Sequence, residues 1–214
     1  MKKNNSVFFT LFISISFLFA QQPDKPTTSE IFHKLQKLNF LGSAMYIAAH
    51  PDDENTRIIS FLSNDVHART AYLSMTRGDG GQNLVGPEIR ESLGVIRTQE
   101  LIAARKTDGG QQYFTRANDF GYSKYPEETL EIWNKEDVLN DVVLNIRRFQ
   151  PDIIINRFNH RNPGSTHGHH TASAMLSFEA FDLTGNVNKN PESAKKYGAW
   201  QPKQLFFNTS WWFY

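Results

Sequence analysis

The stretch YIAAHPDDEN (residues 46–55) places one histidine and three consecutive acidic residues directly after a strand-like apolar run. A turn uses one acidic side chain to cap the helix that follows, and Asp52 or Asp53 alone would have that role. Four titratable side chains within residues 50–54 exceed this need. The stretch therefore predicts either an over-charged loop or an active site at the end of a strand.

Outward from this stretch, short apolar segments alternate with segments of helical periodicity. Strands are expected at residues 44–49, 70–75, 111–115, 151–158 and 203–208, and helices near 29–38, 54–63, 87–106, 135–149 and 171–182. This alternation predicts an α/β fold, a Rossmann-like three-layer domain with a mostly parallel sheet flanked by helices. In such sheets, functional sites form at the C-terminal ends of the strands.

Local signals mark the ends of two of these helices. Thr28 or Ser29 is expected to cap the first helix, and Gly109 with Gly110 is expected to stop the helix at 87–106.

The loop at 160–170 follows a predicted strand, as residues 50–54 do. Two distant stretches of sequence are therefore expected to face one crevice.

Composition limits the class of protein. The chain has 214 residues, with 23 basic and 22 acidic side chains, so its charge balance indicates no general nucleic-acid or acidic-membrane partner. Its length favours one α/β-sized domain over two. The sequence has no cysteine, which excludes disulfides, thiolate nucleophiles and cysteine metal ligands.

The first twenty residues have the pattern of a secretory signal peptide. Lys2 and Lys3 precede an apolar stretch from Val7 to Phe19, and Ala20 offers a cleavage site. Export to the periplasm or the medium is expected, and an uncleaved membrane anchor is the alternative. Residues 21–28 read as a linker and residues 29–214 as the functional domain. Its aromatic end predicts that these residues form the N-terminal part of a longer protein.

Histidines concentrate in the segment NHRNPGSTHGHH (residues 159–170), which holds His160, His167, His169 and His170. Without cysteine, zinc needs imidazole and carboxylate ligands, and a catalytic site has three protein ligands and one open position. His50, Asp53 and one histidine of residues 167–170 would supply them. His167 and His170 would share a face if this segment opens a helix, whereas His169 by itself is expected to be a solvated loop residue.

AHPDDE at residues 49–54, together with the H-x-x-H of His167 and His170, closely resembles the PIG-L/LmbE family of zinc-dependent deacetylases. Members of that family remove the N-acetyl group from N-acetylglucosamine-type conjugates. Similar stretches are TRGDGGQN at 76–83, R-x-x-E-L at 97–101 and DFG at 119–121. The resemblance extends from about residue 44 to residue 208.

The resemblance implies roles for the residues of both loops. His50, Asp53 and His170 would hold one zinc ion, with other divalent metals such as Fe²⁺ as alternatives. Asp52 would act as the general base, and His167 would stabilise the tetrahedral intermediate.

Four further residues are candidates for substrate binding. Arg97 and Asp119 match positions that bind the sugar in this family, although Arg97 could also form a helical surface ion pair with its neighbour one turn later. Arg77 lies in a glycine-rich loop expected near the site, and Glu54 either starts a helix or contacts substrate. The family often has H-P-D-H where this chain has H-G-H-H, so His169 replaces a carboxylate that would orient a neighbouring imidazole.

The expected function is therefore an exported, zinc-dependent amidase that removes acetyl from an N-acetylglucosamine-type sugar or glycoconjugate. Its partner would be a small molecule or glycan, without nucleic acid and without stable membrane insertion. One alternative is a catalytically inactive carbohydrate-binding module, which would need neither Asp52 nor His167. Another is a non-haem iron protein with two histidines and one carboxylate, which leaves the consecutive acidic residues unexplained.

Overall fold

The computed structural model describes residues 25–164 and 166–209, and the chain divides into two compact units, Met1–Asn39 and Phe40–Tyr214. In the first unit, helix α2 spans Thr28–Lys37. Thr27 caps it through a capping box with Glu30, so the cap lies one residue before Thr28 and two before Ser29, the expected positions. The predicted signal peptide lies outside the described residues. Among the helices of the described part, none is long and apolar enough to cross a membrane.

The second unit is built on one five-stranded sheet with the strand order β3-β2-β1-β4-β5. Every neighbouring pair of strands is parallel. The strands are β1 (Ser43–Ala48), β2 (Arg69–Ser74), β3 (Gln111–Phe114), β4 (Ile153–Asn156) and β5 (Gln204–Phe207). The five expected strands are therefore confirmed, with β1 and β2 beginning and ending one residue earlier and β4 shorter at both ends.

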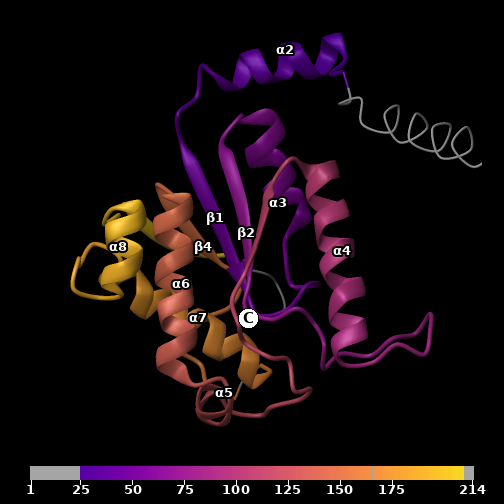
Figure 1. The fold of residues 1–214 in the computed structure, drawn as a ribbon, viewed down its shortest axis with the longest axis vertical. Coiled ribbons are helices and arrows are strands. Elements are labelled where there is room, and N and C mark those ends of the chain that lie inside the picture. Colours follow the sequence, from indigo (N-terminus) through magenta and orange to yellow (C-terminus); the bar gives the residue numbers. More distant parts are fainter. Residues whose placement is uncertain (1–24, 165, 210–214) are drawn as a thin grey trace, which may run out of the picture. The chain divides into compact units, whose positions relative to one another are not determined.

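Helices cover both faces of this sheet, as Figure 1 shows. On one face, α6 (Lys135–Phe149) and α7 (Gly168–Leu183) pack with side chains of β1 and β2 in the larger apolar core. On the other face, α3 (Thr56–Ser60) and α4 (Glu91–Asp108) contribute to a smaller core around Tyr46 and Tyr72. This arrangement confirms the predicted three-layer α/β fold.

The remaining helices differ from expectation. The helix expected at 54–63 is α3 followed by a π-helical segment, η1 (Phe61–Asp65). Two short helices were not predicted, α5 (Pro126–Ile132) and α8 (Pro191–Tyr197). Each has proline in its first turn, a signal that favours a helix start but is easily overlooked when the helix is too short to show periodicity.

Connectivity creates a crevice beside the central strand. The chain moves outward from β1 to β2 and β3 on one side, and then to β4 and β5 on the other. Loops leaving β1 and β4 therefore turn to opposite faces, and the space between them is where ligands bind in open α/β sheets. The loop after β1 contains HPDDE, and the connection after β4 leads to HGHH.

Candidate metal centre

The loop after β1 is arranged by its own backbone. The His50 N–H donates to Asp53 Oδ2 at 2.7 Å, and the Asp53 N–H donates to the His50 carbonyl at 3.3 Å. Asn55, not an aspartate, caps α3 by accepting from the Ile58 N–H. Because neither Asp52 nor Asp53 caps this helix, both carboxylates remain for the crevice.

The second histidine segment begins α7. His167 is the N-cap of this helix and His170 lies in its first turn, which confirms that the segment opens a helix. Phe158, just beyond β4, stacks on the His170 ring with a centroid distance of 3.9 Å and an interplanar angle of 5°. The Gly168 N–H donates to Ser123 O at 2.7 Å, and a Cβ at position 168 would lie 2.5 Å from the Tyr125 carbonyl oxygen. Only glycine allows this close approach of the helix start.

His50, Asp53 and His170 converge as the sequence predicted. Asp53 Oδ2 lies 3.1 Å from His50 Nδ1, and Asp53 Oδ1 lies 3.4 Å from His170 Nε2. One ligand atom from each residue falls within 4.8 Å of the others. Ligands around a tetrahedral zinc ion lie roughly 3.3 Å apart, given zinc–nitrogen distances of about 2.0–2.1 Å. The three side chains therefore fit a divalent metal ion.

The protonation of this group also suits a metal site. Burial lowers the pKa of His170 to about 4, against the opposing charge of Asp53, so its imidazole is neutral at pH 7. Burial opposes protonation of His50 as well, but the hydrogen bond and charge of Asp53 outweigh it and raise the His50 pKa. The pKa of Asp53 is lowered despite burial, because both imidazoles favour the carboxylate. An ion would replace the His50 proton in this pair.

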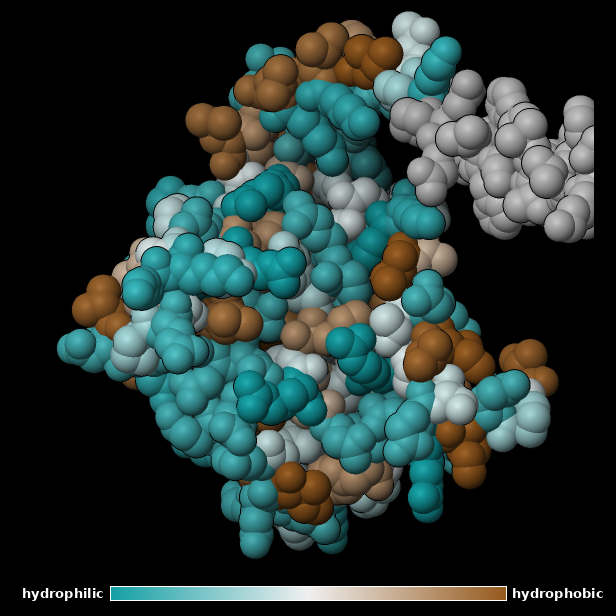
Figure 2. All heavy atoms as spheres, in the orientation of Figure 1, coloured by the Kyte–Doolittle hydropathy of each residue, from teal (hydrophilic) through white to brown (hydrophobic). Residues whose placement is uncertain are grey.

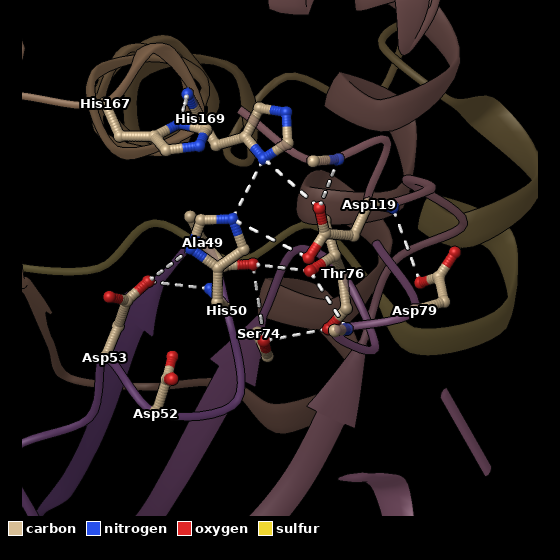
Figure 3. Close-up of polar contacts among 12 residues, drawn as sticks. Ala49, His50, Asp52, Asp53, Ser74, Thr76, Asp79, Asp119, His167 and His169 are labelled. Carbon is tan, nitrogen blue, oxygen red and sulfur yellow. Dashed lines mark hydrogen bonds and ion pairs between the residues drawn. The ribbon is translucent and has the colours of Figure 1, made fainter. Parts of the chain in front are cut away.

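Behind His50 lies a second, buried group (Figure 3). His50 Nε2 is 2.9 Å from His169 Nδ1, and Asp119 Oδ2 lies 4.0 Å from the same His50 atom. His169 is completely buried, so its expected role as a solvated loop residue is wrong. Its ring packs against Phe120 and Trp133 at centroid distances of 4.4 and 4.9 Å. Burial, followed by the neighbouring histidines, lowers the His169 pKa to about 2 and keeps the ring neutral.

His50, His167 and His169 form a second set of ligand atoms within 4.8 Å of one another. This set has no carboxylate, and its fully buried His169 already contacts His50 Nε2. A catalytic site needs an open position for water or substrate. The set with Asp53 and His170 borders the open cavity and therefore fits that requirement better.

His167 has a defined tautomer. Its Nδ1 accepts the His169 backbone N–H at 3.1 Å, so a neutral ring carries its proton on Nε2. Burial and the neighbouring His50 lower the His167 pKa, which favours this neutral form. A backbone hydrogen bond to Gly121 opposes this lowering, so Nε2–H lies beside the cavity with a protein acceptor already in reach.

Asp52 and Arg97 contact one another at the cavity. Arg97 Nη2 lies 3.1 Å from Asp52 Oδ2, and Arg97 Nη1 lies 3.3 Å from Glu100 Oε2. The Asp52 side chain is 71 % exposed, so its carboxylate is accessible to a ligand. The predicted helical pair of Arg97 and Glu100 exists, and the same guanidinium also orients the proposed base.

Two predicted substrate contacts lie elsewhere. The Glu54 carboxylate is 7 % exposed and pairs with the buried Arg105 at 3.2 Å. Arg105 also pairs with Asp108. Arg77 stacks over the Phe114 ring at 4.2 Å and donates to Thr98 Oγ1 at 3.3 Å. Neither Glu54 nor Arg77 lines the cavity at the metal centre. Both side chains are held by contacts within the chain, so their predicted substrate contacts have no support from the position of this cavity and stay predictions.

A cavity of about 1130 Å³ opens in front of the candidate ligands. From the proposed site it is bordered by His50, Asp52, Asp53, Arg97, Asp119, His167 and His170. Asp119 is nearly buried, and burial raises the pKa of its carboxyl group against the hydrogen bond from the Gly121 N–H. Its carboxylate lies 4.0 Å from His50 Nε2 and borders the cavity, so the residue that the DFG stretch offered as a sugar contact lies at the site.

Sequence reasoning missed several supports of the centre. Tyr72 donates its hydroxyl to the His50 carbonyl, and Thr76 Oγ1 donates to the Ala49 carbonyl at 3.1 Å. Phe158 stacks on His170, as described above. A signal exists for Phe158 and Thr76, because both follow the C-terminal end of a strand, where side chains reach the crevice.

The PIG-L family, described as GlcNAc-PI de-N-acetylase, matches residues 45–181. The chain belongs to this family. No curated protein sequence matches it. Among solved structures, N,N′-diacetylchitobiose deacetylase from Pyrococcus horikoshii is similar, with a TM-score of 0.58 and 20 % identity over 82 % of this chain and 66 % of that one.

Two further structures share the fold of this PIG-L family member. The 4-carboxy-2-hydroxymuconate hydratase from Pseudomonas putida has a TM-score of 0.56 and 18 % identity, covering 76 % of this chain and 62 % of that one. A conserved protein from Thermus thermophilus has a TM-score of 0.52 and 19 % identity, covering 78 % and 66 %. The chain thus spans slightly less than two thirds of these structures. Since a deacetylase and a hydratase share the fold, the reaction must be argued from the site.

Proposed function

We propose that this PIG-L family member is a metal-dependent hydrolase that removes the N-acetyl group from an N-acetylglucosamine-type sugar or glycoconjugate. The observation that carries the proposal is the arrangement around the cavity. A three-residue ligand set lies beside the exposed carboxylate of Asp52, which Arg97 contacts, and beside His167, whose Nδ1 accepts a backbone N–H in the helix cap. Membership of a family described as a de-N-acetylase supports the same reaction.

His50, Asp53 and His170 would hold the ion, for which zinc suits two imidazoles and one carboxylate. Such an ion polarises a carbonyl group and lowers the pKa of water from 15.7 to about 7. The chain supplies this ion with a fixed position, because Phe158 stacks on His170 and the backbone of the β1 loop holds Asp53.

Asp52 is the proposed general base. Its carboxylate takes a proton from the water that adds to the acetamide carbon, and it then returns a proton to the nitrogen as the C–N bond breaks. Acetate and a free amine are the products. Arg97 orients Asp52 from one side, and acid–base help of this kind is typically worth about 10² to 10⁴ in rate.

His167 is proposed to stabilise the negative oxygen that develops on the acetamide carbonyl. Its Nε2–H would be the donor, because Nδ1 accepts the His169 N–H, and it would turn from the Gly121 carbonyl to the substrate oxygen. Removing such a donor typically costs about 10² to 10³ in rate. We further propose that Arg97 and Asp119, which both line the cavity, contact the sugar.

The alternatives make different use of the same residues. A catalytically inactive carbohydrate-binding module would not need a base beside the ligand set, yet Asp52 is exposed there. A non-haem iron protein could use His50, Asp53 and His170 with Fe²⁺. Metal analysis of protein purified without added metal distinguishes the native ion, and chelator-sensitive amine release distinguishes the hydrolase from both alternatives.

The central test is Asp52→Asn, with Asp65→Asn as the matched control because Asp65 is exposed and away from this cavity. Primary-amine release from N-acetylglucosamine and small N-acetylated oligosaccharides is measured together with zinc content. We expect Asp52→Asn to keep its metal and lose at least about 100-fold in rate, while the control keeps both. Full activity of Asp52→Asn would exclude the proposed base.

Export is a separate proposal that rests on the signal-peptide pattern of the first twenty residues. Cleavage after Ala20 would make Gln21 the first residue of the mature protein. N-terminal sequencing of the protein recovered from the periplasm or the medium tests this expectation, and an intact N-terminus in a membrane fraction would favour the uncleaved anchor.

A further inference from the structure

The cavity continues well beyond the metal ligands. Its volume of about 1130 Å³ exceeds the range of about 300–1,000 Å³ that is usual for small-ligand pockets. The far part is formed by the loop between β2 and α4 and by the first turns of α4. The lining residues there include Asn83, Leu84, Val85, Glu88, Ile96 and Glu100. A single acetamido sugar at the metal centre would leave this part to the rest of the substrate.

The loop that forms this far part is built around Asn83. Its side-chain oxygen accepts the N–H groups of Val85 and Gly86 at 3.0 and 3.1 Å. Its amide nitrogen donates to Glu88 Oε2 at 3.0 Å and to the Glu88 carbonyl at 3.2 Å. The loop therefore presents Leu84, Val85 and Glu88 in a defined arrangement.

Charge in the cavity is strongly asymmetric. Its lining contains the carboxylates of Asp52, Asp53, Glu88, Glu100 and Asp119, whereas Arg97 supplies the one lysine or arginine charge of the described lining. Arg97 is already paired with Asp52 and Glu100. Even with a divalent ion in place, the lining keeps a net negative charge, and no unpaired cation is present there to receive a phosphate or carboxylate group.

The same part of the cavity offers apolar surface. Leu84 is 92 % exposed and Val85 is 100 % exposed. Contact of two adjacent apolar side chains with water is unfavourable, and a ligand that covered them would remove this contact. In Figure 2, apolar side chains gather at the loop that projects beside the foot of α4. Ile96 lines the cavity from the helix itself.

We propose that the group attached to the acetamido sugar, the aglycone, is uncharged and partly apolar, and that it binds along the Leu84–Val85 loop. A negatively charged aglycone is disfavoured there by Glu88 and Glu100. This inference rests on the proposed function and specifies the chemistry of the aglycone that the substrate carries. The carboxylates disfavour charged aglycones and the apolar side chains favour uncharged ones, so both effects contribute to specificity.

The charge part of the proposal is tested with two ligands of nearly equal size, the 4-carbamoylphenyl and 4-carboxyphenyl β-glycosides of N-acetylglucosamine. Their dissociation constants are measured with the metal-loaded Asp52→Asn protein, and amine release is measured with the unchanged protein. We expect the uncharged ligand to bind at least about tenfold more tightly, because like charges are disfavoured at the site. Equal or tighter binding of the carboxylate would overturn the proposal.

A second variant assigns this preference to the loop. In Glu88→Lys, introduced into the same Asp52→Asn protein, the ratio of the two dissociation constants should fall to about threefold or less, because attraction replaces repulsion. Both ligands are compared in one protein sample, so partial loss of folded protein cancels from the ratio. An unchanged ratio would overturn the role of the loop.

The apolar part is tested with the 4-methylphenyl glycoside. Val85→Ser should weaken its binding about threefold to tenfold, on the scale of one or two buried methyl groups. Val187→Ser is the matched control, since Val187 is also exposed but does not line the cavity. Equal binding to both variants would overturn the apolar contact.

Binding and amine release separate the two levels of the proposal. Absence of amine release from all three glycosides and from N-acetylglucosamine would overturn the proposed function. The binding ratios would still decide whether the cavity prefers an uncharged, apolar aglycone.

Discussion

The two sides of the His50 ring have opposite environments. On the cavity side, Nδ1 faces Asp53, and His170 completes the ligand set. On the inner side, Nε2 faces His169, whose ring is fully buried between aromatic side chains. Nδ1 therefore contacts a carboxylate at the open cavity, whereas Nε2 contacts a neutral buried ring, with the Asp119 carboxylate farther away at 4.0 Å.

This difference shows how the fold separates binding from orientation. A metal ligand needs a carboxylate or imidazole at the ion, but the second nitrogen of a ligating histidine needs only a partner that holds its tautomer and direction. With an ion on His50 Nδ1, the proton of this ring is on Nε2 and is donated to His169 Nδ1, which leaves the His169 proton on its own Nε2. His169 Nε2 has no hydrogen-bond partner among the described residues. The inner contact thus holds the His50 ring in place, but it leaves the His169 Nε2–H donor without a hydrogen bond.

The largest expected effect is on the cavity side. His170→Ala removes a ligand and should weaken zinc binding by more than about 100-fold, since loss of even an outer partner typically costs 10- to 100-fold. Competition with a chromogenic chelator measures the affinity. His160→Ala is the control, because His160 stacks on Phe178 and belongs to neither ligand set. Unchanged zinc affinity in His170→Ala would remove it from the centre.

A smaller effect is expected on the inner side. His169→Phe keeps an aromatic ring against Trp133 but removes the acceptor for His50 Nε2–H, so we expect zinc affinity to fall about 10- to 100-fold. The free energy of unfolding without metal, measured by urea titration, should change much less, because the substitution also removes the unsatisfied His169 nitrogen. Zinc affinity equal to that of the unchanged protein would show that the inner contact does not orient His50.

The smallest effect is expected at the opposite end of the sheet, where a carboxylate has no part in the centre. Asp152 accepts from the Ser43 N–H at 2.9 Å and from Lys203 Nζ at 2.8 Å. The hydrogen bond from Lys203 lowers the Asp152 pKa below 3.8 in the folded protein. The ionised form is therefore stabilised by folding, and this contribution is complete above the unfolded pKa and lost as the pH falls through the folded one.

Asp152→Asn should accordingly reduce the free energy of unfolding by about 1 kcal/mol at pH 7, and by less as the pH falls below about 4. Urea unfolding at both pH values measures the difference. Zinc affinity should not change. A loss of zinc affinity as large as that in His169→Phe would mean that the two ends of the sheet are coupled, and would contradict the local account of the centre.

Much of the architecture was predictable because it depends on periodicity within short segments. The five strands and α6 follow directly from apolar patterns, and Gly109 ends α4 in the left-handed conformation, with φ of 78°. The two seven-residue helices α5 and α8 were missed, because seven residues show no clear period. Their positions are decided by packing against α6 and α7 as much as by their own sequences.

The candidate ligands were also predictable, but their surroundings were not. His50, Asp53 and His170 have the residue types that zinc requires, and strand ends bring them together. Glu54 adjoins Asp53 in the sequence, yet it points to Arg105. His169 adjoins His170, yet it is in the core. Neighbours in a loop or a helix face different directions, so adjacency alone does not decide which side chain reaches a cavity.

From the sequence alone came the kind of fold and the kind of chemistry, since apolar periodicity specifies strands and helices and a short motif supplies the ligand types. Only the tertiary structure decided that Arg97 contacts Asp52, that His167 Nδ1 accepts the His169 N–H, and that Leu84 and Val85 border the same cavity as the ligands. These facts depend on contacts between segments far apart in the chain. Such contacts are set by the packing of the whole domain and have no local signature in the sequence.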